Sequence, residues 1–285
     1  MHGRVIINRA LVTRSPLAAD RTGRMNENYD VRGCVHRLEQ RRFEKYGLDN
    51  GPNRESFDVE FSPTGQVLQQ TDYANAGGIY RTSRFTYDDA GRLVRAVEFD
   101  EAGIEVAISE FEYSGGRQVC TIIDASGVVT GRHVDEYDGD VLTVMGIYDA
   151  NGQPRRLKFF EYVEGKLCQS ISKYYGYDGK FYKQWVTTYD SAGRVAKTFG
   201  LKADGSMLGD GKYVYEYDGE GRPSKVWTFN DWEDVANAVT VSEYVYDQNG
   251  NWTERSEYHR SKRDSNWTKK ITTRRLTYFP VGDFC

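Results

Sequence analysis

The sequence has few of the residue types from which common catalytic and metal sites are built. Its 285 residues include only four histidines and four cysteines, which lie far apart with no C-x-x-C pair. This spacing fits neither a zinc site nor a disulfide framework, so we expect free thiols, no metal and no other cofactor. No G-x-S-x-G motif, phosphate-binding glycine loop or dinucleotide-binding glycine motif is present either. The sequence therefore predicts a protein that is not an enzyme.

Long hydrophobic runs are also lacking. No segment approaches the roughly 18 to 20 apolar residues that cross a bilayer as a helix, so no membrane span is predicted. Residues 1–28 include the apolar stretches VII and ALV, but Asn8 and Arg9 interrupt them, which argues against an export signal. We expect these residues to form a flexible leader. The predicted location is cytoplasmic, with export as the alternative if the start site is wrongly assigned.

Charge of either sign is not in large excess, but it is unevenly distributed. The net charge is −4, which gives no general attraction to nucleic acid or acidic lipid. Residues 61–254 hold 19 Lys and Arg against 30 Asp and Glu (net −11), and residues 255–285 hold 8 against 3 (net +5). We therefore expect an acidic body and a basic end. No Pro/Gly/Ser linker divides the chain, so residues 29–285 are predicted to form one domain.

A six-residue motif recurs in place of site chemistry. It reads YDDAGR from Tyr87, YDANGQ from Tyr148, YDSAGR from Tyr189, YDGEGR from Tyr217 and YDQNGN from Tyr246. The Asp can accept a hydrogen bond from backbone N–H groups two or three residues on, and the Gly can take the left-handed conformation that closes a hairpin. We expect each copy to be a hairpin turn. The Tyr is expected to pack its ring on a neighbouring strand, with its hydroxyl in water or on a backbone carbonyl.

The segments between these turns alternate like β-strands. In GKYVYEYDG, three tyrosines occupy one face while Val214 and Glu216 occupy the other. The segment from Cys34 to Gly47 fits either a short helix or a strand, and we favour the strand. The resulting fold class is all-β: an antiparallel meander of repeated hairpins in an extended, curled or partly closed sheet. Longer loops are expected at residues 71–82 and 230–241, where the repeat spacing is broken.

The motif resembles the repeat of YD-repeat, or Rhs-like, proteins. Tyr87–Arg92, Tyr189–Arg194 and Tyr217–Arg222 match Y-D-x-x-G-R in full, and the resemblance extends over residues 61–279. It implies a long meander of hairpins, which in large members forms a shell around a toxin domain. We expect a short bacterial member without a toxin domain or self-cleavage motif, in which the repeats serve as a scaffold or binding surface.

Aromatic and basic residues supply the candidate binding sites. The stretch YYGYDGKFYKQWVTTY is the densest in aromatic rings, which either close the core or bind a ligand. The segment HRSKRDSNWTKK is predicted to form a basic hairpin tip, which is either a charged edge strand or a contact for nucleic acid or an acidic protein. The parallel sequences around Asn251 and Asn266 indicate that their tryptophans are equivalent. The candidate residues are Tyr174, Tyr175, Tyr177, Tyr182, Trp185, Trp232, Trp252, Trp267, Lys269 and Lys270.

These patterns favour a non-enzymatic binding or scaffold protein. It would recognise a polypeptide partner through a face or edge of the sheet, in an immunity, adaptor or secretion-accessory role. The alternative is carbohydrate binding through the Tyr and Trp rows. Nucleic acid is an unlikely partner at this net charge.

Overall fold

The described chain is built entirely from β-strands and their connections. The computed structural model describes residues 35–44, 56–74, 78–219, 221–229, 238–261 and 267–278. The strands are β1 (Val35–Glu44), β2 (Phe57–Phe61), β3 (Val67–Tyr73), β4 (Ile79–Tyr87), β5 (Leu93–Phe99), β6 (Glu105–Ser114), β7 (Arg117–Asp124), β8 (Val129–Asp138), β9 (Val141–Asp149), β10 (Pro154–Val163), β11 (Lys166–Tyr175), β12 (Phe181–Tyr189), β13 (Val195–Lys202), β14 (Met207–Tyr217), β15 (Pro223–Phe229), β16 (Ala238–Tyr246), β17 (Trp252–Ser261) and β18 (Thr268–Tyr278). None of the described residues forms a helix that could cross a membrane.

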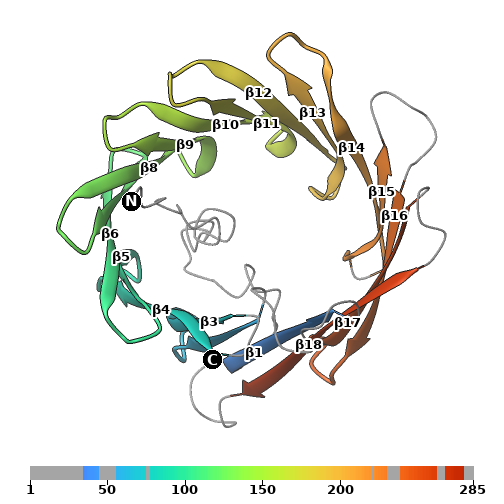
Figure 1. The fold of residues 1–285 in the computed structure, drawn as a ribbon, viewed down its shortest axis with the longest axis horizontal. Coiled ribbons are helices and arrows are strands. Elements are labelled where there is room, and N and C mark those ends of the chain that lie inside the picture. The colour runs from blue at the N-terminus through green and yellow to red at the C-terminus, as the bar shows by residue number, and fades with distance from the viewer. Residues whose placement is uncertain are drawn as a thin grey trace, which may run out of the picture.

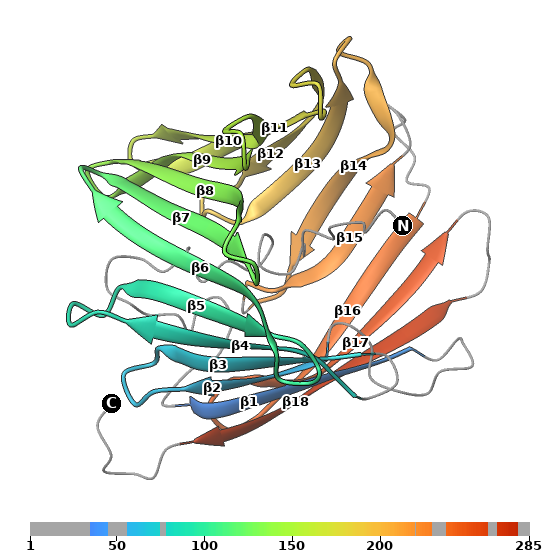
Figure 2. The same cartoon turned by 60° about the vertical axis from the view of Figure 1, so that its left-hand side comes forward.

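The eighteen strands close into a barrel (Figures 1 and 2). Each strand pairs antiparallel with the next, and β1 completes the ring by pairing with both β18 and β2. The predicted antiparallel meander is confirmed, but the open, curled or partly closed sheet is wrong. Closure depends on the total twist, tilt and stagger of all strands, and this total cannot be predicted from a local sequence pattern.

The repeated motif forms the predicted turns. In the copy from Tyr189, the Asp190 carboxylate accepts hydrogen bonds from the backbone N–H groups of Ala192 and Arg194, both at 2.9 Å. Gly193 has a φ of +77°, and the glycines of the other four copies have φ between +77° and +80°. The Arg194 guanidinium returns to the second oxygen of Asp190 at 2.8 Å. The prediction that each copy is a glycine-closed hairpin turn is confirmed.

Five tyrosine hydroxyls link a hairpin to the preceding one. Tyr87 donates to the carbonyl of Val67, 20 residues earlier, and Tyr217 donates to that of Val195, 22 residues earlier. Three more tyrosines do the same: Tyr113 to Leu93, Tyr162 to Leu142, and Tyr244 to Pro223. All five donors lie near the C-terminal ends of even-numbered strands, and therefore at one end of the barrel. Among the motif tyrosines, the expected bond to a backbone carbonyl is confirmed for Tyr87 and Tyr217. The hydroxyl of Tyr189 contacts the Ser170 hydroxyl instead, and that of Tyr246 donates to the Asp218 carboxylate.

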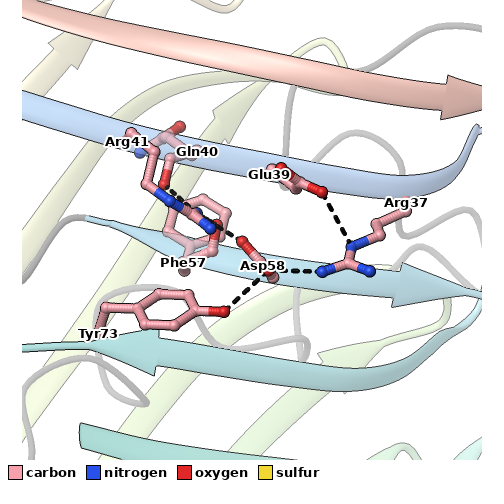
Figure 3. Close-up of polar contacts among 7 residues, drawn as sticks. All are labelled: Arg37, Glu39, Gln40, Arg41, Phe57, Asp58 and Tyr73. Carbon is pink, nitrogen blue, oxygen red and sulfur yellow. Dashed lines mark hydrogen bonds and ion pairs between the residues drawn. The ribbon is translucent and has the colours of Figure 1, made fainter. Parts of the chain in front are cut away.

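The two faces of the wall differ in burial. On β1, Arg37, Glu39 and Arg41 point outward (Figure 3), so the alternate residues Leu38 and Gln40 face the barrel axis. The inner face is the more crowded one, because side chains converge on the concave side of a closed sheet. Fully buried residues on it include Leu38, Val59, Ser170 and Thr272. The apolar core cluster lies on β1 to β7, around Leu38, Val59, Phe85 and Phe111.

The predictions for the first strand, the basic segment and the longer loops have different outcomes. Residues 35–44 form the favoured strand rather than a helix. The basic segment is not an edge, because β18 has a neighbour on each side. The interruption at residues 71–82 is shorter than predicted, since β3 extends to Tyr73 and β4 starts at Ile79. The leader and most of the predicted loop at 230–241 lie outside the described residues, and the domain boundaries stay a prediction.

Candidate binding face

A patch on the inner face of β10 to β14 brings together aromatic rings and cations. Residues directly opposite each other on antiparallel strands share a face. From β8 to β13, one such row reads His133, Ile147, Arg156, Tyr174, Lys183 and Lys202. The next row, two residues along, reads Asp135, Met145, Lys158, Ser172, Trp185 and Gly200. We call the part of these rows on β10 to β14, with Tyr213, the β10–β14 inner patch.

Three aromatic residues form a row across this patch. Tyr174 and Trp185 lie on neighbouring strands, and Trp185 reaches Tyr213 on β14 with 6.1 Å between ring centroids. Gly200 on the intervening strand makes this possible, since a Cβ there would lie 3.2 Å from two atoms of the Trp185 indole. The rings are half-buried, so part of each is open to solvent. Rigid, partly exposed Tyr and Trp rings are favourable binding groups for polypeptides and sugars.

Three cations surround the Tyr174 end of the row. The Arg156 guanidinium lies 5.7 Å from the centroid of the Tyr174 ring, and the Lys183 ammonium lies 5.2 Å from it. Lys158 lies two residues after Arg156 on β10, and its ammonium lies 4.7 Å from the centroid of the Phe160 ring. No carboxylate within the described ranges forms an ion pair with Arg156, Lys158 or Lys183. Burial, with a contribution from the nearby Arg156, lowers the pKa of Lys158 to about 8.

A buried polar pair borders the patch on β8. Asp135 is 2% exposed, and neither of its carboxylate oxygens has a hydrogen-bond partner. Burial raises the pKa of Asp135 to about 7. His133 is also buried, and burial with the charge of Arg156 lowers its pKa to about 4. Cys120, opposite His133, is a free thiol whose pKa burial raises to about 12, which makes it unreactive. Within the described ranges, no group of three or more His, Cys, Asp and Glu side chains is arranged to hold a metal ion.

A second polar cluster lies on the outer face where β1 pairs with β2 (Figure 3). Asp58 on β2 accepts hydrogen bonds from Arg37 and Arg41 on β1 and from the Tyr73 hydroxyl on β3. Arg41 also lies over the Tyr73 ring at 4.6 Å. Burial opposes ionisation of Asp58, but these hydrogen bonds outweigh it and hold its pKa below the ordinary value. Because the Asp58 carboxylate already accepts hydrogen bonds from three side chains of the protein, we interpret this cluster as structural.

The outer face carries a narrow apolar stripe. Across β9 to β13 it reads Val144, Phe159, Ile171, Val186 and Phe199 in directly paired positions. On each strand, the next one or two outward-facing positions beyond the stripe include a polar or charged residue, such as Glu161, Lys173 and Lys197. On β1 the outward positions are charged throughout Arg37 to Arg41. A lipid-facing band would be about 25 Å tall and continuous around the barrel.

The structure disperses the predicted site residues. Tyr174 and Trp185 belong to the inner patch. Tyr175 packs edge-on against Phe181, Tyr177 is 93% exposed in a turn, and Tyr182 is 48% exposed. Lys270 faces inward opposite Glu257, whereas Lys269 faces outward over Tyr258 at 5.1 Å. These two lysines lie on β18, six strands from β12, and Trp232 lies outside the described residues.

Trp252 and Trp267 are not equivalent. Trp252 is 4% exposed, with Arg274 against its ring at 3.5 Å, whereas Trp267 is 40% exposed beside Arg260. The expected duplication of their roles is wrong, because only Trp252 lies at a motif turn, where Asn251 and Tyr278 close over the strand end.

Sequence reasoning missed Arg156, Lys158, Lys183 and Tyr213. Arg156, Lys158 and Phe160 alternate on one strand, which was a visible sign that they share a face. Their proximity to Tyr174 and Lys183 depends on the register between strands, which alternation does not specify.

No protein-family model matches the chain. No curated protein matches it either. Among solved structures, it is similar to a porin-like protein from Bacteroides uniformis ATCC 8492, with 12% identity, a TM-score of 0.45, and coverage of 85% of this chain and 98% of that one. A porin-like protein from Bacteroides vulgatus ATCC 8482 has 14% identity, a TM-score of 0.37, and coverage of 87% and 99%. TcdB2-TccC3-TEV has 13% identity and a TM-score of 0.26, over 80% of this chain but 14% of that one.

The predicted cytoplasmic location is corrected. A closed ring of eighteen antiparallel strands has the strand number of porins. This closure points to an exported or outer-membrane protein, so the cytoplasmic prediction is wrong. The resemblance to YD-repeat proteins stays a prediction, because no family model assigns it.

Proposed function

We propose that this chain is an exported, non-enzymatic binding protein whose barrel holds a polypeptide partner on its inner face. The observation that carries the proposal is the row of Tyr174, Trp185 and Tyr213, which is half-buried and lies on β11, β12 and β14. Tyr and Trp are the residues most often responsible for binding energy in protein interfaces, because they offer large contact areas with few rotatable bonds.

The closed ring supports recognition by side chains rather than by strand addition. Each strand already has a hydrogen-bonded neighbour on both sides, so a partner strand finds no open edge. We therefore no longer propose that a partner binds at an edge of the sheet, and we keep the proposal that it binds on a face.

Export without a membrane span fits the outer face. The charged outward residues of β1 and the polar borders of the apolar stripe would both be costly in lipid. We therefore place the barrel in water outside the cytoplasm.

A photo-crosslinking residue at position 185 tests the proposal in cells that make the protein. We expect a specific polypeptide to be captured from position 185, and not from the outward, exposed position 182 on the same strand. Substitution Trp185→Ala should weaken binding of the recovered partner at least about tenfold, as for an interface hot spot. Equal capture from both positions, or none from either, would contradict the proposal.

Carbohydrate is the second candidate ligand, because a contiguous row of Tyr and Trp rings also suits stacking on sugar faces. A glycan array probed with the full chain separates the two. Glycan binding that Trp185→Ala abolishes, without a crosslinked polypeptide, would favour carbohydrate.

A further inference from the structure

Arg156, Lys158 and Lys183 of the β10–β14 inner patch lack the acidic partners that two arginines have elsewhere on the inner face. Arg81 on β4 is ion-paired with Glu98 on β5, and Arg255 on β17 lies 3.3 Å from Glu257. By contrast, Arg156, Lys158 and Lys183 have no ion-pair partner among the described residues. In the strand register, the nearest acidic positions on this face are Asp149, which lies on the neighbouring strand β9 and is ion-paired with Arg155, and Asp135, which is two strands from Lys158 with Met145 between them.

This arrangement is unfavourable in the unliganded protein. Arg156 and Lys158 face the same way on one strand, and Arg156 and Lys183 flank one ring from the two neighbouring strands. Three like charges close together repel one another, and part of their hydration is lost through burial. An anion bound among them would remove both costs, so the patch is complementary to negative charge.

From this geometry we infer that Arg156, Lys158 and Lys183 make the patch selective for acidic polypeptide segments. They bind Asp and Glu carboxylates, while Tyr174, Trp185 and Tyr213 pack against neighbouring apolar or aromatic side chains. The inference rests on the proposed function and adds to it the chemical class of the partner.

The acidic body of the molecule favours a polypeptide over a dense polyanion. Residues 61–254 carry a net charge of −11, which repels nucleic acid or a heavily sulfated polysaccharide strongly. A polypeptide with a few carboxylates among apolar side chains is repelled less, because it carries less charge, and it meets three cations set among aromatic rings.

A peptide series tests the inference on the full chain. The peptides share the same aromatic and aliphatic residues and differ only in how many glutamines are replaced by glutamate, and binding is measured by fluorescence anisotropy. We expect affinity to rise at least about tenfold from the neutral to the most acidic peptide and to fall with added salt. The triple substitution Arg156→Gln, Lys158→Gln and Lys183→Gln should abolish this rise.

Lys173→Gln is the matched control. Lys173 is also a half-buried lysine over an aromatic ring, 5.5 Å from Phe159, but it lies on the outer face of β11. It should leave the dependence on glutamate unchanged. Lys183→Gln alone should reduce the rise of affinity with glutamate content by about threefold. Because Lys183 is partly exposed, this single variant keeps the test valid if the triple variant misfolds.

The outcomes separate this inference from the proposed function. Peptides that bind equally whatever their glutamate content, but lose affinity in Trp185→Ala, would overturn the acidic selectivity and leave the polypeptide function standing. Binding of an acidic polysaccharide such as polygalacturonate, with no peptide bound, would overturn both. A glutamate-dependent rise that survives the triple substitution would also overturn the inference, because the carboxylates would then bind elsewhere.

Discussion

Single residues in this protein act mainly through backbone conformation and hydrogen-bonding capacity. Gly193 supplies a positive φ that a side chain disfavours, and a Cβ built there meets no atom within 4 Å. The cost of replacing it is therefore conformational rather than steric. Asp135 is the opposite case, since its backbone is ordinary and its carboxylate has no partner.

Substituting Gly193 with alanine should lower the free energy of unfolding by about 1 kcal/mol, because alanine at positive φ is strained. Gly193→Asn should cost less, since asparagine tolerates the left-handed region. Ser191→Ala in the same turn is the control. Chemical denaturation measures all three, and equal effects of alanine and asparagine would contradict a conformational cause.

The buried carboxyl of Asp135 should make stability depend on pH. Its folded pKa of about 7 lies above the ordinary 3.8, so the folded chain favours the protonated form. Stability from this group is complete below about pH 4, falls as pH rises to about 7 and then stays low. Asp135→Asn should therefore raise the free energy of unfolding by about 2 to 4 kcal/mol at pH 8, with no gain at pH 3.

His133 acts in the opposite direction over an overlapping range. Its folded pKa of about 4 lies below the ordinary 6.5, so stability is lost as pH falls from about 6.5 towards 4. This acid-side loss should be clearer in Asp135→Asn and disappear when His133→Gln is added. A wild-type profile unchanged by Asp135→Asn would show that Asp135 ionises normally.

At the scale of elements, the weak place in the barrel is the seam between β1 and β2. β2 is five residues long and pairs with β1 over only four positions, from Arg37 to Gln40. The outer-face cluster around Asp58 lies over this short seam and links β1, β2 and β3 by side chains. We therefore assign it the role of holding the ring closed.

Asp58→Ala should destabilise the chain by about 2 to 3 kcal/mol, because Arg37 and Arg41 lose their shared carboxylate. Hydrogen exchange of β1 amides should increase more than that of β8 amides. Glu39→Gln, which removes a more exposed carboxylate 3.3 Å from Arg37, should cost less than about 1 kcal/mol. Uniform acceleration over all strands would argue against a local seam.

On the scale of the whole molecule, closure removes every sheet edge and separates the side chains into an inner and an outer set. The inner set holds the β10–β14 patch, and the outer set holds a narrow apolar stripe with polar borders. This outer surface supports the proposal that the barrel lies in water.

Cell fractionation should therefore find the protein outside the cytoplasm and release it from membranes in an alkaline carbonate wash. A membrane protein with strands that span the bilayer would resist that wash and serves as the control. Resistance would contradict the water-exposed barrel, and a cytoplasmic fraction would contradict export.

Features that depend on neighbours in the chain were predictable. The Asp and Gly of YDSAGR specify a turn through contacts within four residues, and Val214 between Tyr213 and Tyr215 shows the alternation directly. Tyr174 and Trp185 were selected from aromatic density alone. Arg156, Lys158 and Tyr213 could not be placed beside them, because that proximity passes through the register of several strand pairs.

The sequence by itself determined where the chain turns, which residues alternate, and that the protein is an antiparallel meander, because each of these is set by backbone chemistry over a few residues. Only the tertiary structure decided that the meander closes, with β1 between β18 and β2. It also decided which alternate set faces the axis and which cations remain without an acidic partner. Closure depends on the total twist and stagger of eighteen strands, and this total decides whether the first and last strands come close enough to pair.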